Sequence, residues 1–104
     1  MPGVFEKFEQ HVLKVGPTEV SFPPCTKYGD VGQPESIFVQ TPSSNSCQIY
    51  IGKTGVKYDL STGAFEIPIG ADTILPVFNE NILKAICANA DQTLLITYMA
   101  KELR

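Results

Sequence analysis

The sequence predicts an all-β protein, a small antiparallel β-sandwich or barrel with an extended N-terminal arm. Three observations support this: short runs that alternate apolar and polar residues, β-branched and aromatic residues concentrated in those runs, and Gly, Pro, Asn or Ser clusters between them. The clearest run spans residues 47–52, where Ile49 and Ile51 alternate with their neighbours and a glycine ends the segment. Short strands at this spacing favour a sandwich or barrel over alternating βαβ units.

Two parts are expected along the 104 residues: an N-terminal arm at 1–10 and a β-sandwich domain at 11–104. The first strand is predicted at residues 11–15, although residues 4–15 also fit one face of a short helix. Gly16 and Pro17 then turn the chain into a second strand at 18–22, which two prolines end.

The central runs, at residues 36–40 and 47–52, are predicted to form an antiparallel pair. The connection between them, 41–46, consists entirely of turn residues, which is typical of a hairpin. The segment at 25–35 contains Gly, Asp and Pro and is expected to be the longest loop.

Further strands are predicted after the turn-rich segment that follows Gly52. Pro68 and Pro76 indicate edges or bulges, because proline cannot donate to a ladder. Residues 80–88 fit both a helix capped by Asn79 and a strand, and this alternative stays open. The further strands are expected at 65–69, 73–78 and 93–99, and 56–60 is compatible with a short strand. The strand at 93–99 is expected to be buried on both faces and to follow a hairpin loop at 89–92.

Composition limits the partners that can be expected. The net charge is −3, the pI is about 5.0, and the eight Lys and Arg residues form no run, which argues against nucleic acid. No apolar stretch is as long as a membrane span, and no secretory signal is expected at the N-terminus. Three widely spaced cysteines favour reduced, mostly buried thiols in a reducing compartment, with one cross-link left open.

Two motifs invite a chemical interpretation that the sequence does not support. Gly52-Lys53-Thr54 resembles the end of a phosphate-binding loop, but the position five residues earlier is Cys47, and a strand precedes the motif. We therefore expect a plain turn. His11 is the only histidine, and neither zinc-ligand spacing nor an arrangement for Cys–His catalysis accompanies it.

Acidic and aromatic residues complete the candidates. Asp59, Glu66 and Asp72 are expected to be solvated charges at turns and strand faces rather than a glycosidase pair. The four tyrosines could form a sugar platform, but Trp is absent and two of them lie inside strands. We predict no catalytic, cofactor-binding or metal-ligating residues and no enzyme activity. The cysteines and tyrosines concerned are Cys25, Cys47 and Cys87, and Tyr28, Tyr50, Tyr58 and Tyr98.

The order of the segments resembles small all-β structural proteins of tailed bacteriophage virions, which include capsid decoration (cement) proteins and related minor head proteins. The resemblance runs from His11 to Met99 and depends on an order of strands and glycine turns. Its segments are an opening strand–turn–strand at 11–20, runs at 37–39 and 49–52, turns at 62–63 and 70–72, and closing runs at 83–88 and 94–96.

The resemblance implies a non-enzymatic protein that decorates and stabilises a capsid by binding between major capsid subunits. Its partners would be the major capsid protein and neighbouring copies of itself, with a homotrimer favoured, and its location the virion after synthesis in a bacterial cytoplasm. The arm, with Val4, Phe5 and Phe8, would dock on a neighbouring subunit or on the capsid. The alternatives are a head–tail connector or tail-associated protein, a carbohydrate- or host-receptor-binding β-module and a small enzyme.

Overall fold

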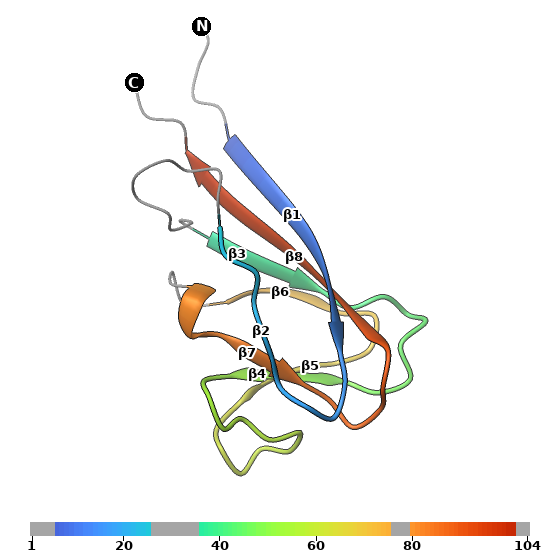
Figure 1. Cartoon of the computed structure of the whole chain (residues 1–104). Coiled ribbons are helices and arrows are strands. Elements are labelled where there is room, and N and C mark those ends of the chain that lie inside the picture. Colours follow the sequence, from blue (N-terminus) through green and yellow to red (C-terminus); the bar gives the residue numbers. More distant parts are fainter. Residues whose placement is uncertain (1–5, 26–35, 76–79, 102–104) are drawn as a thin grey trace, which may run out of the picture.

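The protein is a two-layered β-sandwich in a computed structural model that describes residues 6–25, 36–75 and 80–101 (Figure 1). Every described strand pairing is antiparallel, and the strands divide into two four-stranded sheets. The predicted all-β fold is therefore confirmed.

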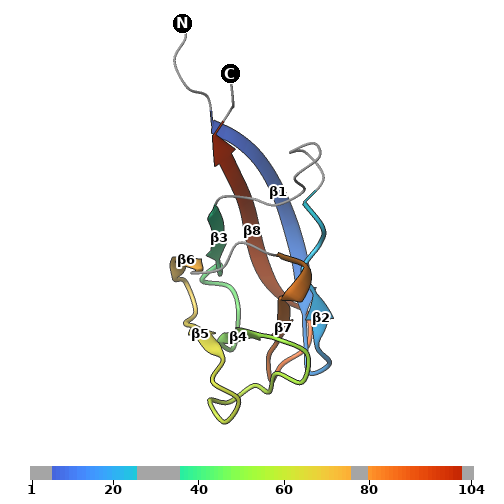
Figure 2. The same cartoon turned by 90° about the vertical axis from the view of Figure 1, so that its left-hand side faces the viewer.

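The first sheet has the strand order β1-β8-β3-β6. The two longest strands pair along their whole length, from Glu6 opposite Lys101 to Val15 opposite Gln92. Figure 2 shows this ribbon curving along one side of the molecule and extending beyond the second sheet. The strands are β1 (Glu6–Val15), β8 (Gln92–Lys101), β3 (Ser36–Gln40) and β6 (Asp72–Leu75).

The second sheet has the order β2-β7-β4-β5 and is built from shorter strands. A single 3₁₀ turn, η1 (Glu80–Ile82), precedes β7 among the described residues. The strands are β2 (Val20–Ser21), β7 (Lys84–Ile86), β4 (Ile49–Gly52) and β5 (Phe65–Ile67).

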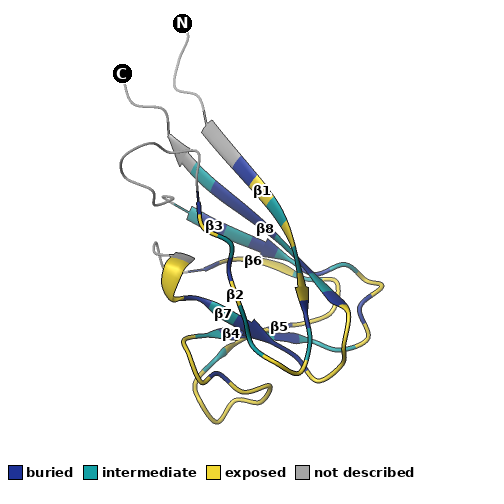
Figure 3. Ribbon diagram, viewed as in Figure 1, coloured by how far each residue is buried: buried dark blue, intermediate teal, exposed yellow. Residues whose placement is uncertain are grey.

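The core lies between the two sheets, and buried residues alternate with partly buried ones along β3 and β4 (Figure 3). Ile37 and Val39 of β3 and Ile49 and Ile51 of β4 are completely buried. The period of two follows from strand geometry, and it explains why the apolar positions could be predicted from the sequence. Leu94, Ile96 and Tyr98 complete the core from β8.

The predicted pairing of residues 36–40 with 47–52 is wrong. β3 pairs with β6 and β8 in the first sheet, whereas β4 pairs with β5 and β7 in the second. Residues 41–46 cross between the layers, so the apolar faces of β3 and β4 enter the common core from different sheets. Packing of the two sheets buries both apolar faces, which a two-stranded hairpin could not do.

The predicted hairpin at 89–92 is also wrong, because β7 and β8 belong to different sheets. Asp91 adopts a φ of 58° in this connection, and the Cys87 N–H donates to the Gly16 carbonyl at 3.0 Å. The open alternative at 80–88 is decided in favour of the strand, because β7 spans Lys84–Ile86 and only the 3₁₀ turn η1 precedes it in this segment.

The compatible strand at 56–60 is not formed, since residues 53–64 are turns, bends and irregular backbone. Asp59 accepts hydrogen bonds from the Ser61 N–H at 2.8 Å and from its hydroxyl at 2.5 Å, and Lys57 N–H donates to the Thr62 hydroxyl. These local bonds occupy groups that a ladder would need.

Several boundaries differ from those expected. β1 begins at Glu6, so residues 6–10, assigned to the arm, pair with β8, while residues 1–5 lie outside the described residues. β2 is only two residues long. β5 ends before Pro68 and is an edge strand, and Pro76 and residues 26–35 lie outside the described residues.

Candidate functional site

The outward face of the first sheet carries an unusual number of apolar side chains. Val12 of β1 is 67% exposed and Ile74 of β6 is 59% exposed, and they lie at opposite margins of the sheet. Phe38, Leu95 and Met99 lie between them, partly buried. We call these five residues the outer face.

The strand registers place the outer face in continuous rows. Val12 lies opposite Leu95, and Phe38 lies between Thr97 and Ile74. An antiparallel sheet with one solvated face normally carries polar residues there. Apolar residues on both faces of β8 indicate that the second face is suited to contact with another protein surface.

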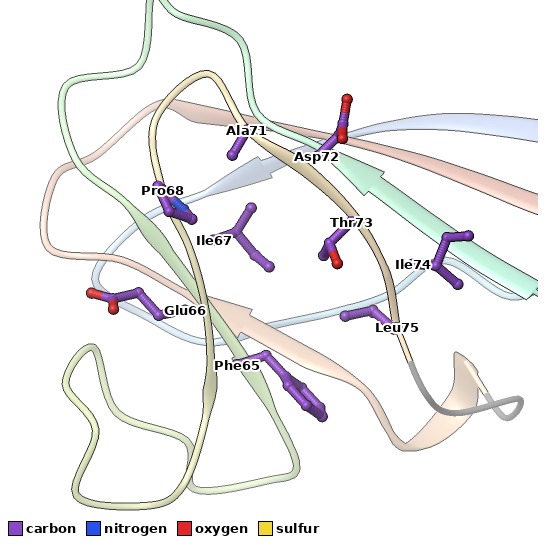
Figure 4. A pocket seen from close by; sticks show the side chains of 9 residues that line it. All are labelled: Phe65, Glu66, Ile67, Pro68, Ala71, Asp72, Thr73, Ile74 and Leu75. Carbon is purple, nitrogen blue, oxygen red and sulfur yellow. The ribbon is translucent and has the colours of Figure 1, made fainter.

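An apolar cleft adjoins this face, at the side of the sandwich where β5 and β6 end their respective sheets (Figure 4). It has a volume of about 450 Å³ and is lined by residues 65–68 and 71–75. Ile67 and Leu75 are buried and point into the space between the strands, whereas Phe65 is 40% exposed. Both flanking strands have one ladder edge without a strand partner in the described sheets.

Thr41 holds the turn that joins β5 to β6. Its hydroxyl donates to the Pro68 carbonyl at 2.6 Å and accepts from the Ala71 N–H at 3.1 Å, and its N–H donates to the Ala71 carbonyl at 2.9 Å. Gly70 adopts a φ of 74°, which side-chain-bearing residues rarely take. The turn is therefore fixed, and so is the spacing of the two edge strands.

Glu66, on the outer side of β5, is already engaged. It accepts hydrogen bonds from the Gln48 amide and, at 3.0 Å, from the Tyr50 hydroxyl. Partial burial, followed by the hydrogen bond to Glu66, raises the pKa of Tyr50 above its ordinary value. Asp59 lies on the loop at 53–64, where hydrogen bonds from Ser61 lower the pKa of its carboxyl. Both carboxylates are therefore engaged by side chains or backbone groups of the protein itself.

A buried polar cluster lies inside the sandwich, near the end of β1 that includes Glu9. Glu9 is 4% exposed and its carboxylate is 2.6 Å from His11 Nε2. The Cys25 thiol lies 3.9 Å from the other Glu9 oxygen, and the His11 ring packs on Tyr98 at 5.5 Å between centroids. Tyr98 donates its hydroxyl to the Pro23 carbonyl.

Nothing in the sequence predicted that His11, a cysteine and a carboxylate would lie together. Glu9 and His11 are alternate residues of β1, and Cys25 joins them from the segment after β2. Glu9 and Cys25 are buried and the His11 side chain is 28% exposed, and four pockets lined by described residues lie elsewhere. The cluster satisfies buried polar groups inside the core.

The Gly52-Lys53-Thr54 segment is a turn, as predicted. The Val56 N–H donates to the Lys53 carbonyl at 3.0 Å, and no helix follows. The Gly55 N–H donates to the Glu19 carboxylate at 2.9 Å, so a side chain of the protein itself uses this backbone donor.

The tyrosines do not form one platform among the described residues. Tyr98 is buried, Tyr50 is partly buried and Tyr58 is 47% exposed, while Tyr28 lies outside the described residues. No group of three His, Cys, Asp or Glu side chains suited to a metal ion was found in the described parts of the chain. Within the same residues, no helix is long and apolar enough to cross a membrane.

The three cysteines are reduced thiols, as favoured from the sequence. Cys25 and Cys87 are buried, and Cys47 is partly exposed. Cys47 and Cys87 lie close together at the ends of β4 and β7, which their separation in the sequence did not indicate.

Comparison of the chain with protein-family models, with curated proteins and with solved structures found no match in any of the three.

Proposed function

We propose that the protein is a non-enzymatic structural protein of a bacteriophage virion, which decorates the capsid by binding between major capsid subunits. The outer face of the first sheet is the surface that contacts neighbouring copies and the shell. The observation that carries this proposal is the set of apolar residues on the outward side of β1, β8, β3 and β6, with Val12 and Ile74 largely exposed.

A structural role requires an interface rather than a pocket with reactive groups. Specific interfaces bury roughly 1,200–2,000 Å² in total and are most apolar at their centre. The outer face offers such a centre, and Gln40, Lys14 and Asp72 provide a polar margin on the same strands. The unpaired edges of β5 and β6 beside it could accept a strand from a neighbour, as exposed sheet edges do.

Symmetry extends the proposal to a homotrimer. A ring with three-fold symmetry repeats one contact, in which the outer face of one copy meets a different surface of the next. Repeated weak contacts around a shell then add by avidity, so no single contact has to be strong.

The test compares two Ile or Leu to Lys variants. Ile74→Lys places a charge on the outer face, whereas Leu60→Lys places the same charge at a loop position of nearly equal exposure, 61% against 59%. Multi-angle light scattering of the full chain is expected to give a trimer mass for the wild type and for L60K, and a monomer mass for I74K.

Co-sedimentation with capsids of the phage that carries the chain provides the second measurement. Wild type and L60K are expected to pellet with the particles, and I74K to bind at least ten-fold more weakly. Wild-type protein that stays monomeric and in the supernatant would contradict the proposal. A larger ring would favour a connector, and monomers that bind glycans would favour a receptor-binding module.

A further inference from the structure

Two of the three cysteines converge on one backbone residue, Asn89. The Asn89 N–H donates to Cys47 Sγ at 3.4 Å, and the Cys87 thiol donates to the Asn89 carbonyl at 3.1 Å. Cys47 also contributes to the raised pKa of the Cys87 thiol, which agrees with the two side chains lying near each other. Cys47 and Cys87 are therefore neighbours in space although the chain between them includes four strands and a 3₁₀ turn.

The register of β4 and β7 explains this proximity. Tyr50 lies opposite Ile86, so continuing the antiparallel pairing would place Cys47 opposite Asn89 and diagonal to Cys87 on the same face. Diagonal neighbours have Cα atoms roughly 7–8 Å apart, and a disulfide needs roughly 4.4–6.8 Å. The sulfur atoms thus require a backbone shift of about 1–2 Å to bond.

The backbone at Cys47 can make that shift. β4 begins at Ile49, so Cys47 precedes the ladder, whereas the Cys87 N–H is held by the Gly16 carbonyl at 3.0 Å. Closure therefore moves residue 47 toward a stationary partner, with no β4–β7 ladder bond to break.

We propose that Cys47 and Cys87 form a modification site, a dithiol that a low-molecular-weight disulfide such as glutathione disulfide converts into an intramolecular disulfide. Cys47 is the attacking thiol because it is partly exposed, and Cys87 is the resolving thiol because it is completely buried.

The reaction proceeds in two exchanges. The Cys47 thiolate attacks one sulfur of glutathione disulfide, the S–S bond breaks, and one glutathione leaves as its thiolate. Cys87 then loses its proton to solvent, its thiolate attacks Cys47 Sγ, and the second glutathione leaves. Two protein thiols are oxidised to one disulfide, and one glutathione disulfide is reduced to two glutathione molecules.

The second exchange is expected to be the slow one. Burial, followed by the hydrogen bond and charge of Cys47, raises the pKa of the Cys87 thiol to about 12. In the mixed disulfide Cys47 no longer carries a charge, but burial still disfavours the Cys87 thiolate, so the second exchange is expected to become faster as the pH rises.

Cys25 supplies an internal control because it lies far from this pair. The Cys25 thiol contacts the Glu9 carboxylate, whereas the Cys87 N–H contacts the Gly16 carbonyl. Glu9 and Gly16 are seven residues apart along β1 and its continuation. At about 3.3 Å per residue the separation is roughly 23 Å, beyond the reach of a disulfide.

The experiment treats the reduced full chain with glutathione disulfide at pH 8 and quenches it with acid. Remaining thiols are then alkylated with N-ethylmaleimide for intact mass and peptide mapping. Wild type and Cys25→Ala are expected to lose two hydrogens and to yield a 47–87 linked peptide. Cys87→Ala is expected to stop at a glutathione adduct on Cys47, and Cys47→Ser to show no linkage.

Thermal unfolding provides a second readout, since the linkage closes a loop of roughly 40 residues. The melting temperature of the oxidised wild type and Cys25→Ala is expected to rise by at least about 5 °C, and reduction should reverse the rise. A wild-type chain that keeps three alkylatable thiols, retains glutathione on Cys47, or links through Cys25 would overturn the proposal.

Discussion

Asn45 is predicted to act as a substitute strand partner for β8, and replacing it should destabilise the fold measurably. β3 pairs with β8 as far as Gln40 opposite Leu95, where its ladder ends. Beyond that point the Asn45 side chain takes over: its Nδ2 donates to the Thr93 carbonyl at 2.9 Å, and its Oδ1 accepts from the Thr93 N–H at 2.9 Å. Both bonds are those that a neighbouring strand would make.

The magnitude follows from these two bonds. Each hydrogen bond contributes roughly 1 kcal/mol net, and more where water cannot replace it, so Asn45→Ala should lower the free energy of unfolding by about 2–3 kcal/mol. The melting temperature should fall by roughly 10 °C for a domain of this size. Asn45 is only 9% exposed, which limits the rescue by water.

Urea unfolding followed by far-UV circular dichroism measures this change, with Ser44→Ala as the control at the exposed neighbouring position. Asn45→Asp keeps the oxygen that accepts from Thr93 N–H but turns a second oxygen toward the Thr93 carbonyl, so at pH 7 it should destabilise at least as much as N45A. A loss below about 0.5 kcal/mol in N45A would refute the reasoning, because water would then replace both bonds.

Three further predictions concern packing and pH. A Cβ at Gly52 would lie 2.9 Å from Val56 Cγ2, so Gly52→Ala should lower the free energy of unfolding in urea by about 1–3 kcal/mol. Adding Val56→Ala should recover part of that loss. No recovery would contradict the clash. Leu94→Ala should cost about 2–5 kcal/mol by the same measurement, because Leu94 is completely buried. Val12→Ala should cost less than about 0.5 kcal/mol in the monomer, because Val12 is 67% exposed. Equal losses would be inconsistent with the core described. The raised pKa of Cys87 means that the reduced folded chain keeps a proton that the unfolded chain loses above about pH 9, so the free energy of unfolding should fall between pH 9 and pH 12. The stability of Cys87→Ala should decline less across that interval. Parallel declines of the two proteins would argue against the shift.

The sequence by itself determined the fold class and most of the core. Ile37, Val39, Ile49 and Ile51 alternate with less buried neighbours, and in a strand this pattern places them all on one face regardless of what that face meets. The edge position of β5 was also predictable, because Pro68 cannot continue a central ladder.

Partner choice could not be read from the same pattern. Turn residues at 41–46 are compatible with both a hairpin and a crossing between layers, and the pairing of β3 with β8 and of β4 with β7 selects the crossing. The same holds for 89–92, where the Gly16 carbonyl binds the end of β7 before the chain enters β8.

The candidate sites were decided almost entirely by the tertiary structure. The apolar run of β8 predicted burial on both faces, whereas Leu95 and Met99 are only partly buried and face outward beside Val12 and Ile74. Cys47 and Cys87 became neighbours through the register of β4 and β7, a long-range pairing. Local sequence specifies which side chains share a face of a strand. The burial of those faces against one another specifies which strands meet. Surfaces built from several strands therefore depend on the tertiary packing.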